Sequence, residues 1–276
     1  MEHRELQIQE LEILLEFQRI CQRHGLRYFL TAGTLLGAVR HSGFIPWDDD
    51  IDIAMPREDF ERLPVVCRTE LDLQYFFQDY TTEPNFPYYF AKIRKNGTEV
   101  YEAGLDDIEM HKGVYIDIFP LDICPDRAWK AVLFFKGVEL LNCALLSKVS
   151  KRFLCGYRKW YMRTAYHTLR HLPKGALFAL REWLRKAMAV GASGKRLCTV
   201  SGRHGYPRET YQVQWFERAQ ELYFEGRTFP VPGGWDELLC SMYGDYMTIP
   251  PEEEQERHFT EREKGKNETS DYLRHL

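Results

Sequence analysis

Four aspartates within the five residues Asp48 to Asp52 set the strongest constraint on how this chain can fold. Ile51 and Ile53 alternate with Asp50 and Asp52, which is the two-residue period of a half-buried strand. In such a strand the isoleucines face the core and both carboxylates leave from the opposite face. These like charges repel each other, so the arrangement is costly unless a cation lies between them. A hard divalent ion that prefers oxygen ligands, Mg²⁺, is the cation that best fits two carboxylates. The competing interpretation is an acidic surface loop.

A second acid occupies an apolar strand further along the chain. Asp117 lies between Ile116 and Ile118, which repeats the pattern around Asp52. A lone carboxylate in an apolar strand is expensive to bury. We therefore expect Asp117 to join Asp50 and Asp52 as a third metal ligand, from a neighbouring strand.

The segment before the aspartates has the pattern of an anion site. Residues 27–32 predict a buried strand, Gly33 and Thr34 a turn, and residues 35–40 the start of a helix. Free backbone N–H groups and the helix dipole attract phosphate at such a junction. Further elements are predicted from about Glu5 to His24 (helix), from Arg57 to a stop near Pro64 (short helix), over residues 88–94 (strand) and from Trp235 to Tyr243 (helix).

Composition favours a packed cytoplasmic protein. The chain has 276 residues, 44% hydrophobic and 14% aromatic, enough for one large domain or a core domain with an insertion. Its seven cysteines are scattered without a CxxC pair, which favours reduced thiols over a disulfide framework or a zinc site. We expect neither a signal peptide nor a transmembrane helix, because the N-terminus is charged and no run of about 18 apolar residues occurs.

Positive charge is concentrated in one block. The net charge is −4, yet residues 127–196 carry sixteen Lys and Arg against two acids, a local charge of +14. Residues 176–190 predict an amphipathic helix with an apolar stripe, and its basic residues lie elsewhere: Arg181, Arg185 and Lys186. Such a helix can lie on an anionic membrane or pack on the core within a helical subdomain, and the pattern leaves both open. Nucleic acid is not expected as a partner, because no binding motif accompanies the charge.

Taken together, these segments resemble the LicD family, which includes the fukutin-related proteins and belongs to the nucleotidyltransferase-fold superfamily. The similarity extends from about Tyr28 to Pro251 and is weakest from Arg127 to Gly205. It is carried by Gly33-Thr34, Gly37 to His41, Pro46 to Asp52, Tyr89 to Thr98, Ile116 to Asp122, Tyr243 to Met247 and Pro250-Pro251.

The resemblance implies an α/β (α+β) fold, with a nucleotidyltransferase-like mixed sheet flanked by helices and a basic helical insertion. We expect the catalytic core in residues 1–126 and the insertion in 127–205. Residues 206–251 would complete the LicD-like domain, and residues 252–276 would form a charged, mobile tail.

The resemblance also implies an activity. Family members move a phospho-alcohol from a CDP-activated donor to a sugar hydroxyl, and phosphocholine from CDP-choline is the best-known bacterial case. The family's metal-binding catalytic pair maps onto Asp50 and Asp52 and its third acid onto Asp117, with Mg²⁺ as cofactor and Mn²⁺ as the alternative. The donor phosphates would be bound by Gly33, Thr34, Arg40 and Lys92. Asp48 and Asp49 would lie next to the metal ligands without binding the metal themselves.

The expected acceptor is a sugar of a cell-surface glycan, teichoic acid or lipopolysaccharide precursor, which can be lipid-linked. A cytoplasmic enzyme at the inner face of an anionic membrane would meet such a precursor. Two alternatives stay open: a nucleotidyltransferase that transfers NMP to a small molecule or sugar, and a catalytically dead glycan-binding protein. The sequence does not identify the transferred alcohol.

Overall fold

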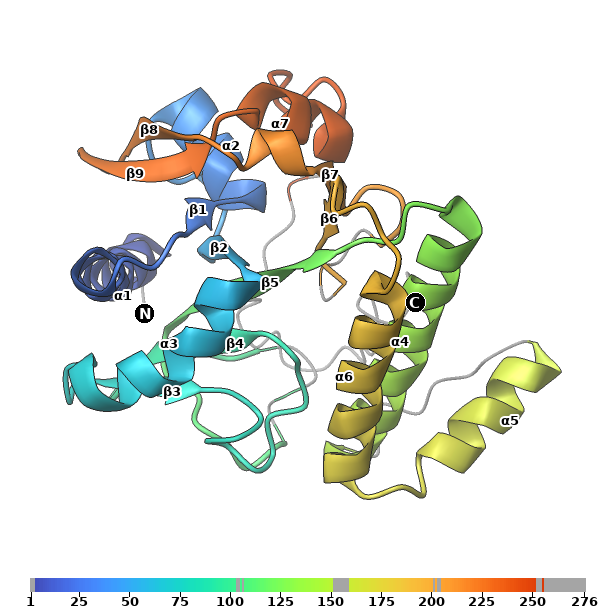
Figure 1. The fold of residues 1–276 in the computed structure, drawn as a ribbon. Helices are drawn as coiled ribbons and strands as arrows, with labels where there is room; N and C mark the ends of the chain where they lie inside the picture. Colours follow the sequence, from blue (N-terminus) through green and yellow to red (C-terminus); the bar gives the residue numbers. More distant parts are fainter. Residues whose placement is uncertain are drawn as a thin grey trace.

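The computed structural model describes residues 3–102, 105, 107–150, 159–200, 202, 205–251 and 255, and these form a mixed α/β fold (Figure 1). A seven-stranded sheet has the order β1-β2-β5-β4-β3, with β6 paired to β5 and β7 to β6, and β8 and β9 form a separate hairpin. Among the described strands, only β2 and β5 pair in parallel. The strands are β1 (Phe29–Leu30), β2 (Asp52–Pro56), β3 (Tyr75–Gln78), β4 (Ala91–Lys95), β5 (Tyr115–Ile123), β6 (Arg196–Cys198), β7 (Thr210–Gln212), β8 (Ala219–Phe224) and β9 (Arg227–Pro232).

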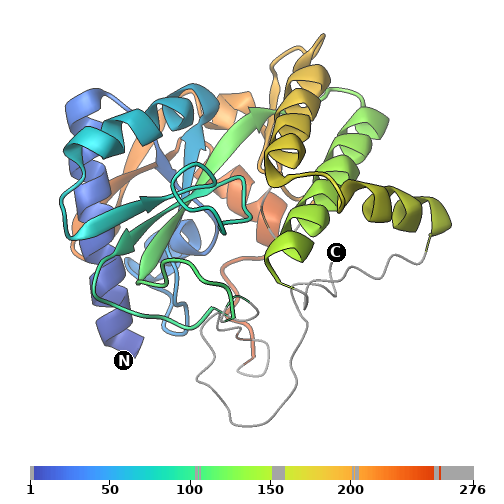
Figure 2. The same ribbon diagram turned by 90° about the horizontal axis from the view of Figure 1, so that it is seen from below.

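Helices flank this sheet, and three of them form a lobe on one side. Figures 1 and 2 show α4 and α6 side by side with α5 beyond them, while α1 lies at the opposite side of the sheet. The helices are α1 (His3–His24), α2 (Ala32–His41), α3 (Arg57–Glu70), α4 (Ala128–Val149), α5 (Trp160–Leu169), α6 (Lys174–Ala189), α7 (Trp235–Tyr243) and the 3-10 helix η1 (Val213–Trp215). The predicted mixed sheet with flanking helices is confirmed.

The isoleucines that alternate with the acids form the centre of the core. Ile53 of β2 pairs in register with Ile118 of β5, and both have no exposed surface. Ile51 and Ile116 are equally buried. Burial of these apolar side chains fixes the register, because a slip by one residue would turn the carboxylates into the core.

The elements differ from prediction at several boundaries. Gly33 and Thr34 lie in the first turn of α2 instead of a separate turn, and β2 begins only at Asp52. The predicted stop at Pro64 is wrong, because α3 continues through it to Glu70. Proline removes one helical hydrogen bond, but Leu63 and Cys67 bury the inner face of α3 across the break and hold the helix together.

The helical lobe has its own apolar contacts. Leu177 and Phe178 of α6 pack against Leu141 and Leu145 of α4. Arg181 also lies on this buried face, so its predicted place outside the apolar stripe is wrong. Its guanidinium donates to Asn142 Oδ1 at 2.7 Å and lies 4.2 Å from the centre of the Tyr89 ring, which compensates the buried charge.

The remaining predictions concern thiols, membrane spans and domain boundaries. Five described cysteines are free, but Cys143 is disulfide-bonded, so the expectation of reduced thiols fails there. Among the described helices, none combines the length and the apolar character that a bilayer crossing demands. The predicted division into domains stays a prediction, and its tail over residues 252–276 lies outside the described residues apart from Gln255.

Candidate active site

Three charged side chains from adjacent strands form one row across the sheet. Asp52 of β2 pairs with Asp117 of β5, which pairs in turn with Lys92 of β4. Directly paired residues project from the same face of a sheet. Lys92 Nζ lies 3.0 Å from Asp117 Oδ1. The structure thus places Asp117 beside Asp52, as the isoleucine pattern predicts.

The loop that carries Asp48, Asp49 and Asp50 leads into this row. Gly33 lies directly against the loop, because a Cβ atom on Gly33 would come within 2.6 Å of Asp48 Oδ2. Thr34 fixes the start of β2, since its Oγ1 accepts the backbone N–H of Asp52 at 2.8 Å. The first turn of α2 is therefore packed against the acidic segment.

A buried ion network neutralises part of the row. Lys92 Nζ lies 3.0 Å from Glu102 Oε2, and Arg94 Nη2 donates to Glu102 Oε1 at 2.5 Å. Lys92 also lies 3.2 Å from the centre of the Tyr115 ring. Two cations thus balance Glu102 and Asp117. Sequence reasoning missed Glu102, although two cations on one face of a buried strand call for an acidic partner.

A further carboxyl group comes from α1. Glu10 has no exposed surface, and among the described residues neither of its carboxylate oxygens has a hydrogen-bond partner. Burial raises the pKa of Glu10 well above its usual range, and the charges of four aspartates add to the rise: Asp50, Asp49, Asp48 and Asp117. The signal in the sequence is an acid at a position of α1 where the helical period demands an apolar residue, between Leu6 and Ile13.

Burial and mutual repulsion shift the pKa values of the acids in and near the loop. Burial raises the pKa values of Asp48 and Asp52 well above their usual range, and the charge of Asp50 adds to both. Burial also raises the pKa of Asp117 to about 6, although Lys92 opposes the rise. Burial alone would raise the pKa of Glu102, but Lys92 and Arg94 outweigh it and hold that pKa at about 2.

The chemistry of this donor set fits a divalent cation. Carboxylate oxygens are the donors that Mg²⁺ and Mn²⁺ prefer, and a cation would offset the repulsion among these acids. In the described part of the chain, no three His, Cys, Asp or Glu side chains are already arranged to hold an ion. The carboxylates would therefore reorient on binding.

Arg40 lies in the last turn of α2. Its Nη1 donates to the carbonyl oxygens of Tyr246 at 2.9 Å and Thr248 at 3.4 Å. The guanidinium also lies 5.9 Å from the centre of the Trp47 ring. Arg40 thus connects α2 to the segment after α7.

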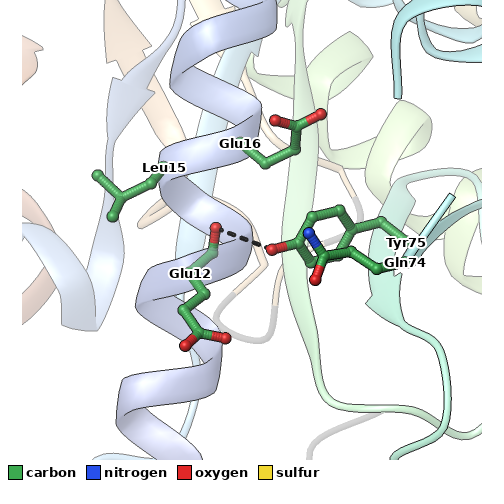
Figure 3. A pocket seen from close by; sticks show the side chains of 5 residues that line it. All are labelled: Glu12, Leu15, Glu16, Gln74 and Tyr75. Atoms are coloured by element: carbon green, nitrogen blue, oxygen red, sulfur yellow. Dashed lines mark hydrogen bonds between the residues drawn. The ribbon is translucent and has the colours of Figure 1, made fainter. Parts of the chain in front are cut away.

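Two surface pockets lie away from the acidic loop and the row of charges. One lies between α1 and β3, where the Tyr75 hydroxyl donates to the Glu12 carbonyl oxygen at 3.4 Å (Figure 3). The other lies between α6 and the segment after β3, with Tyr80, Lys174 and Phe178 in its lining. Neither pocket contains a residue of the acidic loop or the row, so neither is the candidate site.

Comparison with known proteins connects this site to a family. Residues 25–137 match the family described as LicD/FKTN/FKRP, nucleotidyltransferase domain. The chain is 31% identical over 264 residues to the lipopolysaccharide cholinephosphotransferase LicD of Haemophilus influenzae, which covers 92% of this chain and 95% of that protein. The ribitol 5-phosphate transferase FKRP of Homo sapiens is 48% identical over 40 residues, 14% of this chain and 8% of that protein. An uncharacterized protein of Rickettsia prowazekii is 42% identical over 48 residues, 17% of this chain and 18% of its own.

Proposed function

The chain belongs to the LicD/FKTN/FKRP family, and from that premise we propose that it transfers phosphocholine from CDP-choline to a sugar hydroxyl of a cell-surface glycan precursor, with release of CMP. The observation that carries the proposal is the match over 92% of the chain to a lipopolysaccharide cholinephosphotransferase. Lipopolysaccharide precursors are therefore the first acceptors to test, and teichoic acid precursors the second.

The reaction is an in-line displacement at phosphorus. The sugar hydroxyl oxygen forms a bond to the β-phosphorus, the bond from that phosphorus to the bridging oxygen breaks, and CMP leaves. Asp117 accepts the hydroxyl proton, a role that a positioned carboxylate can fill. Lys92, 3.0 Å from Asp117 Oδ1, orients this carboxylate.

The acids also provide the cation site of the proposal. Asp50, Asp52 and Asp117 would hold Mg²⁺ or Mn²⁺, with Asp48 and Asp49 in support. When bound, the cation supplies the positive charge that offsets the donor diphosphate and the leaving phosphate. Asp52 and Asp117 suit this role because they stand side by side in neighbouring strands.

Donor phosphates are assigned to Gly33, Thr34, Arg40 and Lys92. The contact of Gly33 with Asp48 supports this for the first turn of α2, because a phosphate there would lie next to the acidic loop and its cation. Lys92 lies in the row itself, where it shares its charge between two carboxylates. For Arg40 the supporting contact is indirect, through the segment after α7.

The test is product analysis with the purified protein. CDP-choline, CDP-ribitol and CDP-glycerol are each incubated with a sugar acceptor and Mg²⁺, and CMP is measured. We expect CMP release with CDP-choline. CMP release only with another CDP-alcohol would show that the enzyme transfers that alcohol phosphate instead of phosphocholine. Pyrophosphate release from a nucleoside triphosphate would favour the nucleotidyltransferase. Failure of CDP-choline to bind in calorimetry would favour the non-catalytic glycan-binding protein.

We also propose that the enzyme works in the cytoplasm at the inner face of an anionic membrane. Large apolar side chains are exposed on the helical lobe, among them Trp129, Trp160 and Trp183 at 60%, 73% and 64%. Tryptophan is favoured at membrane interfaces, and the surrounding Lys and Arg suit anionic headgroups. A lipid-linked acceptor would be met there.

A further inference from the structure

Glu10 is anomalous for a side chain in the middle of a packed helix. Its neighbours on the same side of α1 are the core residues Leu6, Ile13 and Leu14. The side chain has no exposed surface, and neither carboxylate oxygen has a hydrogen-bond partner in the part of the chain that the structure describes. An unpaired buried polar group destabilises the folded state, and a charged one does so more strongly. An apolar residue of similar size would pack here without that cost.

The surroundings of Glu10 add to the anomaly. Gln7, one helical turn earlier on the same side of α1, donates from Nε2 to the backbone oxygen of Asp48 at 2.9 Å. This bond holds α1 against the loop that carries the aspartates. Glu10 is thus a buried acid on the side of α1 that contacts the acidic loop, and the charges of nearby aspartates act on it. Burial favours the reverse arrangement, an acid beside a base.

We propose that Glu10 is a fourth cation-binding carboxylate of this site. A divalent cation, Mg²⁺ or Mn²⁺, that enters the acidic cluster supplies the positive partner that the two Glu10 oxygens lack. The inference deepens the proposed function and rests on it, because it assigns a residue of α1 to the same cation site. The hydrogen bond from Gln7 to Asp48 keeps α1 against this loop.

A structural role for Glu10 is the competing explanation. In that case Glu10 would stay neutral and act only as a hydrogen-bond donor. The substitution Glu10→Gln keeps the size of the side chain and a donor, but the amide cannot carry the negative charge. The substitution therefore separates the two roles.

The test is calorimetric titration of the metal-free protein with MgCl₂ and with MnCl₂. Glu10→Gln is expected to weaken cation binding about tenfold or more, which is the range found when supporting groups of metal sites are removed. The matched control is Glu5→Gln, the same change on an exposed position of the same helix, and it should bind like the wild type. Wild-type affinity in Glu10→Gln overturns the proposal.

Thermal unfolding in chelator shows whether the variants fold. Glu10→Gln and the apolar Glu10→Met should melt at or above the wild-type temperature without metal, because each removes a buried carboxyl group that has no partner. The upward shift of the melting temperature by Mg²⁺ should be smaller in both variants than in the wild type. A lower melting temperature in chelator for both would show that the carboxyl group has a structural partner, and this also overturns the proposal.

Failure of the inference is distinguishable from failure of the proposed function. If the wild type binds Mg²⁺ but releases no CMP from any CDP-alcohol, the proposed function fails and the assignment of Glu10 stands on the binding data. If the wild type releases CMP and Glu10→Gln binds Mg²⁺ equally well, only the assignment of Glu10 fails.

Discussion

At the scale of single residues, three aspartates carry the proposed chemistry. Asp50→Asn, Asp52→Asn and Asp117→Asn should each lower CMP release by about 10²–10⁴-fold, the usual effect of losing a group that acts at the reacting centre. Each change also removes one negative charge from a crowded cluster, so the melting temperature in chelator should stay level or rise. Glu58→Gln, on an exposed position of α3, is the control. Wild-type turnover in one of these variants would show that the substituted aspartate is not part of the active site.

The raised pKa of Asp117 predicts an unusual dependence of stability on pH. In metal-free protein the pKa rises from 3.8 to about 6 on folding, because burial disfavours the charged form. Folding therefore takes up a proton between these values. The contribution of Asp117 to the free energy of unfolding is present below pH 3.8 and falls as pH rises through 6, by about 2–3 kcal/mol.

Asp117→Asn isolates this contribution, because asparagine does not titrate. Urea unfolding of both proteins in chelator from pH 4 to pH 8 should show the wild type losing stability relative to the variant, with a level difference above about pH 7. A constant difference across this range would mean that Asp117 is already ionised at pH 4. Added Mg²⁺ should reduce the loss, because a cation favours the carboxylate.

The buried pair of Lys92 and Asp117 should be strongly coupled. Lys92→Met keeps the volume but leaves two buried carboxylates with less positive charge, so the free energy of unfolding should fall by about 3–5 kcal/mol. Adding Asp117→Asn to it should recover part of the loss, with a coupling energy of about 0.5–3 kcal/mol in a double-mutant cycle. Lys95→Met is the control: its partner Glu12 is half exposed, and an effect below about 1 kcal/mol is expected. Equal effects at both lysines would contradict the coupling.

Some residues of the site could be predicted and others could not, for a physical reason. Alternation with isoleucine assigns Asp52 and Asp117 to one face of two strands, because strand periodicity is local. Glu10 and Glu102 come from a helix and a loop, and their contacts depend on how these elements pack. The local sequence indicates these two glutamates only weakly. The signals are an acid on the apolar side of α1 for Glu10 and two cations on β4 that need an acidic partner for Glu102.

At the scale of elements, α3 shows how burial overrides a local break. Pro64→Ala would restore a backbone N–H donor in the middle of α3, four residues after Phe60. We expect the free energy of unfolding to rise by about 1–2 kcal/mol, since the regained helical bond outweighs the greater freedom of the unfolded chain. The change is measured as a shift of the urea midpoint, with Val65→Ala at the neighbouring exposed position as control. A lower midpoint for Pro64→Ala would mean that ring contacts of Pro64 stabilise α3 more than the missing bond weakens it.

The lengths of elements follow from packing more than from local pattern. The strand predicted over residues 27–32 is only Phe29–Leu30, because its pairing with β2 extends over two residues. By contrast, α7 has the predicted bounds, Trp235–Tyr243, since Gly234 and Gly244 stand at its ends. On α6 the helical period was predicted, but the depth of the buried face, which includes Arg181, was not.

At the scale of the whole molecule, the basic block divides into paired and exposed charges. Arg181 is buried against Asn142, and Arg185 Nη2 pairs with Glu182 at 2.5 Å and with Glu61 at 3.2 Å. Arg181 therefore connects α6 to α4 and Arg185 connects α6 to α3, so both are unsuitable for probing a membrane. Lys159 and Arg163 at α5 are exposed, and Trp160 between them is 73% exposed. The outer helix of the lobe is thus the part best suited to meet lipid.

Charge reversal on α5 tests the proposed contact with an anionic membrane. The wild type should sediment with vesicles that contain anionic lipid at low salt and stay in the supernatant at high salt, because each Lys or Arg near the surface contributes about 1 kcal/mol that salt screens. Lys159→Glu combined with Arg163→Glu should reduce sedimentation but spare CMP release with a soluble acceptor. Arg227→Glu, exposed on the β8–β9 hairpin away from the lobe in Figure 1, is the matched control and should sediment like the wild type. If the wild type stays in the supernatant at low salt, the lobe is an ordinary helical subdomain and its charge serves packing and solubility.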